Sequence, residues 1–350
     1  MLYICQKKIN KLTSKVNYPA VSVVLPFYRP GKKLDEAVQS IVDQDLKDWE
    51  MVLVNNNACN ISEEIALKWA CNDCRIRVVH ENAQSVAHAM NAGLKHARAG
   101  LVARMDADDV SLPGRLRKQV DYLNENLDAD VVSAQTIFSS DIKESRGFSV
   151  YVDWQNSLIT HKEHYLSRFI ESPLAQPTVM FRKKLIGLYG YYNTGDLPED
   201  YEMWLRWFEK GVRFYKIPEP LVQWNDHNER LTRTHNNYST GAFQKVRYEY
   251  LSRWIKKHIP SGKKIIICGS SRNITRKAGL LSEFGVTPDG FTDIKPPGSP
   301  RAGFIPYNHI TDPEKYFILN LISKRGVGQA IRNHFAAIGF VEGRDLLLAG

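Results

Sequence analysis

The sequence predicts an α/β protein with a mostly parallel mixed sheet, followed by a second, smaller α/β unit at the C-terminal end. Two observations support this prediction. Between residues 21 and 105, apolar runs of strand length alternate with stretches of helical periodicity, and repeated βα units of this kind form parallel sheets. Pro260-Ser261-Gly262 then interrupts the chain, and a new strand-to-glycine pattern begins after it.

The order of the elements places three polar loops at one edge of the predicted sheet. The first strand, Val21 to Pro26, runs into a turn-like segment, and a helix follows with Leu34, Val38 and Ile41 on one face. We expect further strands at 50–55, 75–80 and 101–105, and helices at 62–70, 85–99 and from about 112. Ligands of such sheets bind beyond the carboxyl ends of the strands. The loops at 26–30, 55–57 and 106–109 should therefore share one cleft.

The composition predicts two domains joined by a helix. We expect an N-terminal extension over residues 1–19, a main domain over 20–248, a linking helix over 249–261 and a small Rossmann-like domain over 262–350. A dinucleotide-binding fingerprint needs several glycines near the first strand of such a domain, and the segment from Gly269 supplies only one. A docking or structural role is therefore the favoured interpretation of the small domain.

Charge and hydropathy narrow the classes of function. The chain of 350 residues carries a net charge of +9, which favours an anionic partner. Its basic residues are scattered as doublets without a recognisable nucleic-acid-binding motif, so a nucleic acid is not the expected partner. No run approaches the ~18 apolar residues of a membrane span, and no signal peptide is evident. These features predict a cytoplasmic protein, with peripheral contact at the inner face of the membrane left open.

The five cysteines fit a reducing compartment, because they lack the density of a disulfide framework. Cys71 and Cys74 have the spacing of a metal knuckle, but no second pair completes a zinc tetrahedron. A zinc site is not expected there.

Three aspartates in the segment 104–113 form the strongest candidate site. If the apolar run before them is a strand, its alternation directs Asp106 and Asp108 to one side and Asp109 to the other. Two converging carboxylates suit a divalent cation such as Mg²⁺ or Mn²⁺, whose open positions then take the oxygens of a diphosphate. The alternative is an acidic turn that caps the next helix through Asp109 or Ser111, although a cap needs only one carboxylate.

A second acidic site is expected at the start of a helix over 199–210. Tyr201, Trp204 and Phe208 fall at helical spacing and should pack inward, which leaves Asp200 in the first turn. The helix dipole favours an anion there, so Asp200 should stay ionised near neutral pH and accept a proton. Glu199 and Asp200 as mere partners of the dipole are the alternative.

Several ordered motifs together resemble the family 2 glycosyltransferases. They are Val-Leu-Pro-Phe-Tyr, Leu-Val-Asn-Asn, Asn-Ala-Gly, Ala-Arg-Met-Asp-Ala-Asp-Asp and Pro-Glu-Asp-Tyr-Glu-Met-Trp, spread over residues 20 to 235. The resemblance implies a GT-A type catalytic domain, a nucleotide-diphosphate sugar as donor and an inverting reaction. It also extends to bacterial members with a companion domain at the C-terminal end.

The resemblance assigns roles to individual positions. It places Asp106 and Asp108 in the metal-binding DXD motif and Asp200 as catalytic base, with Glu199 in support. His227 resembles a position near the cation or the diphosphate, with a capping role as the alternative. Asn56 stands where the family has a base-reading aspartate, which leaves a UDP-sugar open as donor. The positions expected to bind the nucleotide sugar are Pro26, Tyr28, Asn56, Asn91, Arg104 and Asp106.

We therefore expect a metal-dependent inverting glycosyltransferase that acts on a hydroxyl of a glycan or lipid-linked acceptor in cell-surface glycan synthesis, with Mn²⁺ or Mg²⁺ as cofactor. A nucleotidyltransferase that makes activated sugars is the first alternative, although it normally has a glycine-rich phosphate loop. A basic nucleic-acid-binding protein, with binding that falls steeply with salt, is the second.

Overall fold

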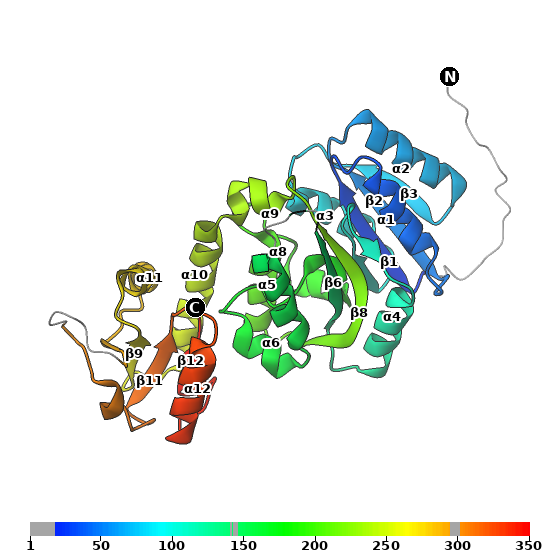
Figure 1. Cartoon of the computed structure of the whole chain (residues 1–350). Helices are drawn as coiled ribbons and strands as arrows, with labels where there is room; N and C mark the ends of the chain where they lie inside the picture. Colours follow the sequence, from blue (N-terminus) through cyan, green and yellow to red (C-terminus); the bar gives the residue numbers. More distant parts are fainter. Residues whose placement is uncertain (1–17, 141, 143–145, 295–301) are drawn as a thin grey trace.

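The computed structural model describes residues 18–140, 142, 146–294 and 302–350 and contains two sheets (Figure 1). The larger sheet has the strand order β3-β2-β1-β4-β7-β6-β8-β5, and the smaller has the order β10-β9-β11-β12. The predicted α/β class and the second small parallel sheet are both confirmed. Most of the predicted N-terminal extension, residues 1–17, lies outside the described residues.

Parallel pairing dominates the first half of the large sheet, as the βα alternation predicts. Strands β1, β2, β3 and β4 pair in parallel, whereas β7 pairs antiparallel with both β4 and β6. The strands are β1 (Val21–Phe27), β2 (Trp49–Asn55), β3 (Ile76–His80), β4 (Leu101–Arg104), β5 (Val110–Ser111), β6 (Val131–Ser140), β7 (Met180–Arg182) and β8 (Phe214–Asp226).

Helices cover both faces of this sheet because its central strands are apolar on both sides. All seven residues of β2 are buried, and β1 is buried along nearly its whole length. One core includes side chains of α1 and α4, and the other includes side chains of α3 and α8. The helices of this part are α1 (Lys33–Val42), α2 (Asn60–Asn72), α3 (Val86–His96), α4 (Arg115–Glu125), α5 (Arg146–Ser157), α6 (His161–Ser167), α7 (Lys184–Tyr189), α8 (Glu199–Glu209) and α9 (Leu231–Thr234).

The two sheets are joined by α10 (Thr240–His258), which is longer than the linking helix expected from the sequence. The Ser239 hydroxyl caps it by accepting a hydrogen bond from the Ala242 amide at 3.3 Å. The expected boundary between residues 248 and 249 therefore falls inside one helix. Its pattern was hidden because polar residues interrupt the apolar face in its first two turns.

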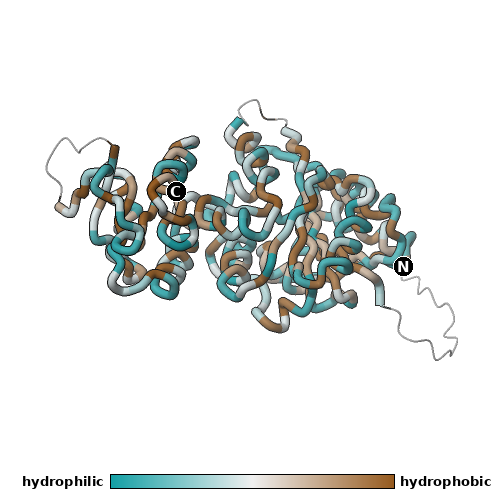
Figure 2. The backbone as a smooth tube through the Cα atoms, turned by 90° about the horizontal axis from the view of Figure 1, so that it is seen from below, coloured by the Kyte–Doolittle hydropathy of each residue, from teal (hydrophilic) through white to brown (hydrophobic). Residues whose placement is uncertain are grey.

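The small C-terminal part packs directly on α10, and the two parts share one hydrophobic core. Leu251 and Trp254 of α10 lie in one cluster with Ile267 and Phe317 of the small sheet and with Tyr201 of α8. Figure 2 shows hydrophobic segments in the interior of both parts. The remaining elements are β9 (Lys264–Cys268), α11 (Arg272–Glu283), β10 (Gly290–Thr292), β11 (Tyr316–Asn320), α12 (Val327–Ala337) and β12 (Leu346–Leu348).

Among the described residues, no helix combines the length and the hydrophobicity that crossing a bilayer requires.

Candidate functional site

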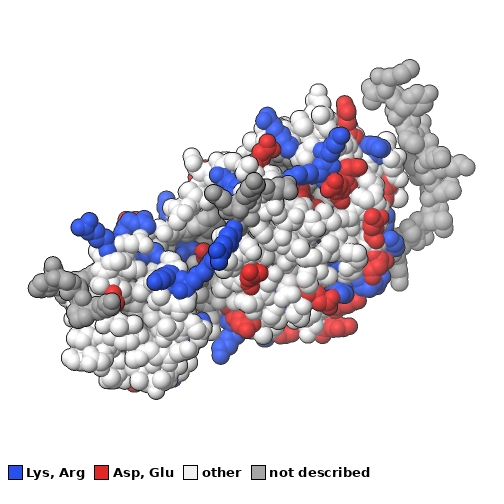
Figure 3. Space-filling model, in the orientation of Figure 1, with Lys and Arg blue, Asp and Glu red and all other residues white. Residues whose placement is uncertain are grey.

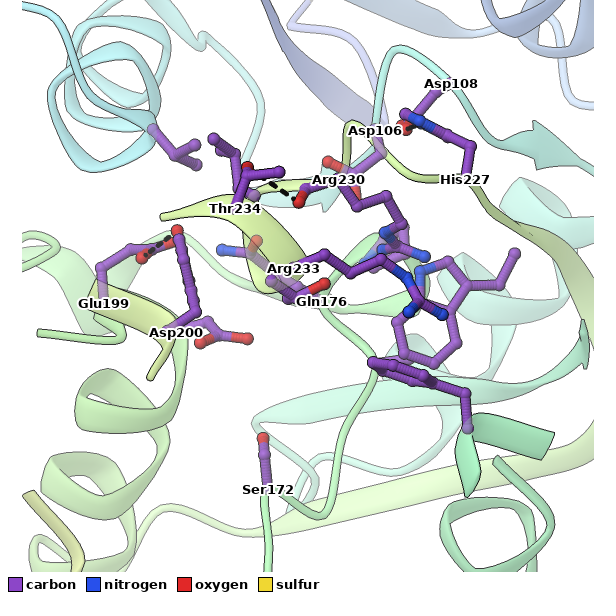
Figure 4. A pocket seen from close by; sticks show the side chains of 18 of the residues that line it. Asp106, Asp108, Ser172, Gln176, Glu199, Asp200, His227, Arg230, Arg233 and Thr234 are labelled. Atoms are coloured by element: carbon purple, nitrogen blue, oxygen red, sulfur yellow. Dashed lines mark hydrogen bonds and ion pairs between the residues drawn. The ribbon is translucent and has the colours of Figure 1, made fainter. Parts of the chain in front are cut away.

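The loops predicted to share a cleft do converge on one cavity of about 1190 Å³. Of the ten residues predicted for the site, nine line this cavity, and Asn91 does not. In Figure 4, Asp106 and Asp108 lie on one side of the pocket, and Glu199 and Asp200 on the other. The predicted residues that line it are Pro26, Tyr28, Asn56, Arg104, Asp106, Asp108, Glu199, Asp200 and His227.

The acidic loop follows β4, and a buried arginine binds the backbone at the point where the loop begins. Arg115 of α4 is fully buried and donates a hydrogen bond to the Arg104 carbonyl oxygen at 2.7 Å. Its Nε donates to the Gln119 side chain at 3.1 Å, and Gln119 in turn donates to the Thr178 carbonyl oxygen at 2.7 Å. These contacts fix the backbone from which the acidic loop departs.

All three aspartates of the loop come together, which corrects the expected orientation of Asp109. One carboxylate oxygen from each of Asp106, Asp108 and Asp109 lies within 4.8 Å of the other two. The strand ends at Arg104, so the alternation of a strand does not apply to the turn that follows it. Asp109 is buried and accepts a hydrogen bond from the Asn225 amide at 2.8 Å.

The capping alternative for these aspartates is not what the structure shows. Helix α4 begins after Gly114 and has no side-chain cap. The three carboxylates instead have the charge density of a cation site. Burial raises the pKa of Asp109 well above its usual value, and the negative charges of Asp108 and Asp106 raise it further. Oxygen donors at this spacing fit a divalent cation such as Mg²⁺ or Mn²⁺.

His227 reaches the same cluster from the end of β8. Its Nε2 lies 2.7 Å from Oδ2 of Asp108. Burial alone would raise the pKa of Asp108, but the hydrogen bond with His227 and the charge of Arg230 lower it below its usual value. Asp108 is therefore an ionised carboxylate, and His227 is placed beside the oxygen that a cation would contact.

Arg104 is a buried positive charge between the two acidic groups. It forms an ion pair with Asp106 and is only 2% exposed. Burial lowers the pKa of Arg104, but the hydrogen bond and the negative charge of Asp106 raise it by more, and the charge of Glu199 raises it further. The pKa of Arg104 therefore lies above its usual value. Its Nε is buried and has no hydrogen-bond partner among the described residues.

Glu199 and Asp200 begin α8, whose inward-facing aromatic residues are buried as predicted. The Tyr238 hydroxyl donates to Oε2 of Glu199 at 2.7 Å, and Asp200 accepts from the Tyr201 amide at 2.6 Å. Burial raises the pKa of Asp200 to about 6 and, together with the Asp200 charge, that of Glu199 to about 7. The helix-dipole argument from the sequence missed this effect of burial. Asp200 is the more acidic of the two and is mostly ionised at neutral pH.

Tyr28 and Asn56 line the cavity in different ways. The Tyr28 ring is 39% exposed, and the Arg29 guanidinium lies 4.7 Å from its centre, so one more flat group can stack there. The Asn56 amide nitrogen donates to the carbonyl oxygens of Glu81 and Ala83, both at 2.8 Å. The Asn56 side chain thus shapes the loop before α3, and its donors are already used.

Asn91 has a structural task outside the cavity. Its side chain donates to the Tyr192 carbonyl oxygen and accepts from the Tyr192 amide, both at 2.9 Å. This double hydrogen bond holds the segment before α8 against α3. Tyr192 is buried and Tyr191 is exposed, and neither lines the cavity.

The sequence alone gave no site role to Arg115 or Arg230, and it directed Asp109 away from Asp106 and Asp108. Arg230 lies over the Trp224 ring, 4.5 Å from its centre, and donates to the Asn225 carbonyl oxygen at 3.1 Å. It lines the cavity beside His227. Its position three residues after His227 was the only available signal.

Comparison with known proteins identifies the family. Residues 22–187 match the model of glycosyl transferase family 2. The O-antigen biosynthesis glycosyltransferase WbnJ of Escherichia coli is 28% identical over 67% of this chain and 89% of its own length. The amylovoran biosynthesis glycosyltransferase AmsE of Erwinia amylovora is 28% identical over 58% of this chain and 74% of its own length.

A solved structure supports the same fold. TarS 1-349 of S. aureus, in complex with UDP-GlcNAc, superposes with a TM-score of 0.54 at 16% identity, covering 75% of this chain and 71% of that chain. The GT-A type architecture expected from the sequence is therefore confirmed. On the match over residues 22–187 and on these relatives, the larger domain of this chain is a family 2 glycosyltransferase domain.

Proposed function

We propose that this glycosyltransferase uses a nucleotide-diphosphate sugar and a divalent cation, and transfers the sugar with inversion to a hydroxyl of its acceptor. One observation carries the proposal: a carboxylate cluster suited to a cation and a separate carboxylate suited to a base line the same cavity. The biosynthetic roles named for WbnJ and AmsE support a place in cell-surface glycan synthesis.

The donor diphosphate is proposed to bind at the acidic loop. Asp106 and Asp108 would hold Mg²⁺ or Mn²⁺, with His227 beside Asp108 as a further candidate ligand. When bound, the cation offsets negative charge on the leaving diphosphate. Arg104 adds a fixed positive charge, buried and already oriented by Asp106, that stabilises the same leaving group.

Asp200 is proposed as the base. The acceptor hydroxyl oxygen attacks the anomeric carbon as the bond from that carbon to the diphosphate oxygen breaks, and the hydroxyl proton passes to Asp200. A pKa of about 6 suits this task, since the group is mostly ionised at neutral pH yet basic enough to take the proton. Glu199, held by Tyr238, supports Asp200 and contacts the acceptor.

The nucleobase is proposed to stack on Tyr28 beside Pro26. Because the donors of Asn56 are engaged by Glu81 and Ala83, the side-chain amide does not favour uracil over another base. A panel of donors is therefore the right first experiment.

The proposal is tested by incubating the protein with nucleotide sugars of different base and sugar, with Mn²⁺, Mg²⁺ or EDTA. We expect one or a few of these donors to be hydrolysed slowly by water, with release of nucleoside diphosphate only when a divalent cation is present. A parallel incubation with a nucleoside triphosphate and a sugar 1-phosphate tests the alternative, and release of pyrophosphate there would instead support a nucleotidyltransferase. Donor turnover that is unaffected by EDTA would refute the proposed cation.

A further inference from the structure

The end of the cavity beyond Asp200 is built by α10 together with the small C-terminal part. Thr240, Phe243, Gln244 and Arg247 line it from one face of α10, as their helical spacing requires. Ser323 and Arg325, from the loop that follows β11, line it from the other side. The small sheet therefore contributes side chains to the same cavity as the catalytic residues.

Arg247 is a buried cation that no ion pair neutralises in the described part of the chain, although the charge of Glu171 acts on it. It is 9% exposed, and the one side-chain hydrogen bond that it forms with the described residues runs from Nε to the Tyr201 hydroxyl at 3.4 Å. It forms no ion pair with any aspartate or glutamate in the described part of the chain. Burying a charge without an ion-pair partner is costly, so such a side chain in a cavity wall is suited to an anionic ligand.

A second arginine lines the same end, and a buried lysine supports the loop that carries it. Arg325 is exposed, and its Nη2 donates to the Gly147 carbonyl oxygen at 3.4 Å, across from the small part to α5. Lys277 is only 3% exposed and donates to the Leu321 carbonyl oxygen and to the Ser323 hydroxyl, both at 2.6 Å. Lys277 thus holds the loop that presents Arg325.

The negative charge at this end is smaller than the positive charge. Glu171 is the carboxylate that lines it beside Arg247 and Arg325, and its side chain forms no ion pair with either of them. On the face that Figure 3 shows, Lys and Arg side chains gather where the two parts of the molecule meet. The local balance of charge therefore favours an anion.

Neutral polar groups complete the wall. Gln155 is 1% exposed, lines the cavity, and has a side-chain oxygen without a hydrogen-bond partner among the described residues. Gln244 is 8% exposed and also lines it. Such groups can contact the hydroxyls of a sugar next to the anionic group.

We propose that Arg247 and Arg325 bind an anionic group of the acceptor, either a phosphate or a sugar carboxylate. This inference rests on the proposed function, which assigns the acceptor hydroxyl to Asp200. The donor diphosphate is assigned to Asp106 and Asp108. In Figure 4, Ser172, which lines the same cavity, lies apart from Asp106 and Asp108. The small C-terminal part is then a component of the acceptor site.

The inference is tested with the full chain and with two simple probes, inorganic phosphate and glucuronate, in the presence of EDTA. The chelator removes any cation-dependent binding of phosphate at Asp106 and Asp108. Affinities are measured by calorimetry at low and high NaCl for wild type, Arg325→Ala and Arg247→Gln. Arg117→Ala is the control, because Arg117 lies outside the cavity in an exposed pair with Asp45.

We expect wild type to bind at least one probe, more weakly at high salt, and each variant to lose about tenfold in affinity. Binding of phosphate alone indicates a phosphorylated acceptor, and binding of glucuronate alone indicates an acidic glycan. Failure of wild type to bind either probe, or wild-type affinity in both arginine variants, overturns the inference. If Arg247→Gln fails to fold, Arg325→Ala decides, because Arg325 is exposed.

The result is independent of the donor site. Binding of a sugar nucleotide with Mn²⁺ is measured separately in wild type and Asp108→Asn. If the proposed function is wrong, Asp108→Asn binds the sugar nucleotide as tightly as wild type does. If the present inference is wrong, the arginine variants bind phosphate and glucuronate with the same affinity as wild type.

Discussion

The chemistry of single residues in this cavity is governed by burial. Asp108 has a lowered pKa although burial opposes this, because His227 and Arg230 lie beside it, whereas burial raises the pKa values of Glu199 and Asp200. The two ends of the cavity thus differ. The end at Asp108 keeps a fixed negative charge, and the end at Glu199 and Asp200 exchanges a proton near neutral pH.

A pH profile should report the titration of Asp200. With a pKa of about 6, Asp200 loses its capacity to accept a proton as the pH falls below that value. We expect kcat/KM to decline about tenfold per pH unit on the acid side, with the bend near pH 6. A profile that stays flat down to pH 4.5 would argue against Asp200 as the base.

Because the Glu199 carboxylate is buried, we expect a variant without its charge to be more stable, by an amount that depends on pH. The folded-state pKa of Glu199 lies above that of the unfolded chain, so the folded state retains the proton longer and stability is lost as the pH rises from about 4 to about 7. Glu199→Gln should therefore raise the free energy of unfolding by about 1–3 kcal/mol at pH 8 and leave it nearly unchanged at pH 4.

Denaturant titration at both pH values measures this difference. Asp121→Asn serves as the control, because Asp121 is an exposed carboxylate on α4. An equal gain at pH 4 and pH 8 would show that the Glu199 charge is not the cause.

At the scale of elements, the active cavity depends on how closely α3 packs on the sheet. Gly93 faces β1 and β2, where an added Cβ would meet Val24 and would lie 3.1 Å from Cγ2 of Val54. The close approach also brings Asn91 to the backbone of Tyr192. The Asn-Ala-Gly motif is therefore explained by packing and by loop anchoring.

Gly93→Ala should consequently destabilise the fold. Overpacking of a rigid interface costs about 1–3 kcal/mol. Gly279 of α11 is the matched control, because a Cβ there meets no atom within 4 Å. Gly279→Ala should be neutral or stabilising by about 0.5–1 kcal/mol, since alanine is the better helix former. Equal thermal midpoints for wild type and Gly93→Ala would contradict this account of α3.

The strands and helices of the first 125 residues were largely predictable, because their signals are local. The side-chain partners were not. Contacts between separate segments engage the Asn56 side chain with Glu81 and Ala83. Such contacts also shape the turn that brings Asp109 beside Asp106. A motif can indicate which residues lie at a cavity, but the hydrogen bonds that occupy them depend on the tertiary fold.

At the scale of the whole molecule, α10 connects the two parts through a common core. Tyr248, Leu251 and Ile255 are almost completely buried, and the Trp254 ring lies 6.0 Å from the Phe317 ring of β11, measured between centroids. The sequence predicted two units, but neither the length of α10 nor this shared core, because both depend on contacts across long sequence separations.

Removal of the small part should therefore destabilise what remains. A chain ending at residue 261 would expose the apolar face of α10 that packs on β9 and β11. We expect a lower thermal midpoint than that of the full chain and a tendency to associate, measured by calorimetry and by light scattering. A monomeric, equally stable fragment would show that the shared core is not needed.

The most direct measurement of the central claim compares Asp108→Asn with Asp200→Asn in two assays, sugar-nucleotide binding with Mn²⁺ and sugar transfer. The account predicts that Asp108→Asn loses both, whereas Asp200→Asn retains binding and loses at least a hundredfold in transfer. Retention of cation-dependent binding by Asp108→Asn, or wild-type transfer by Asp200→Asn, would contradict it.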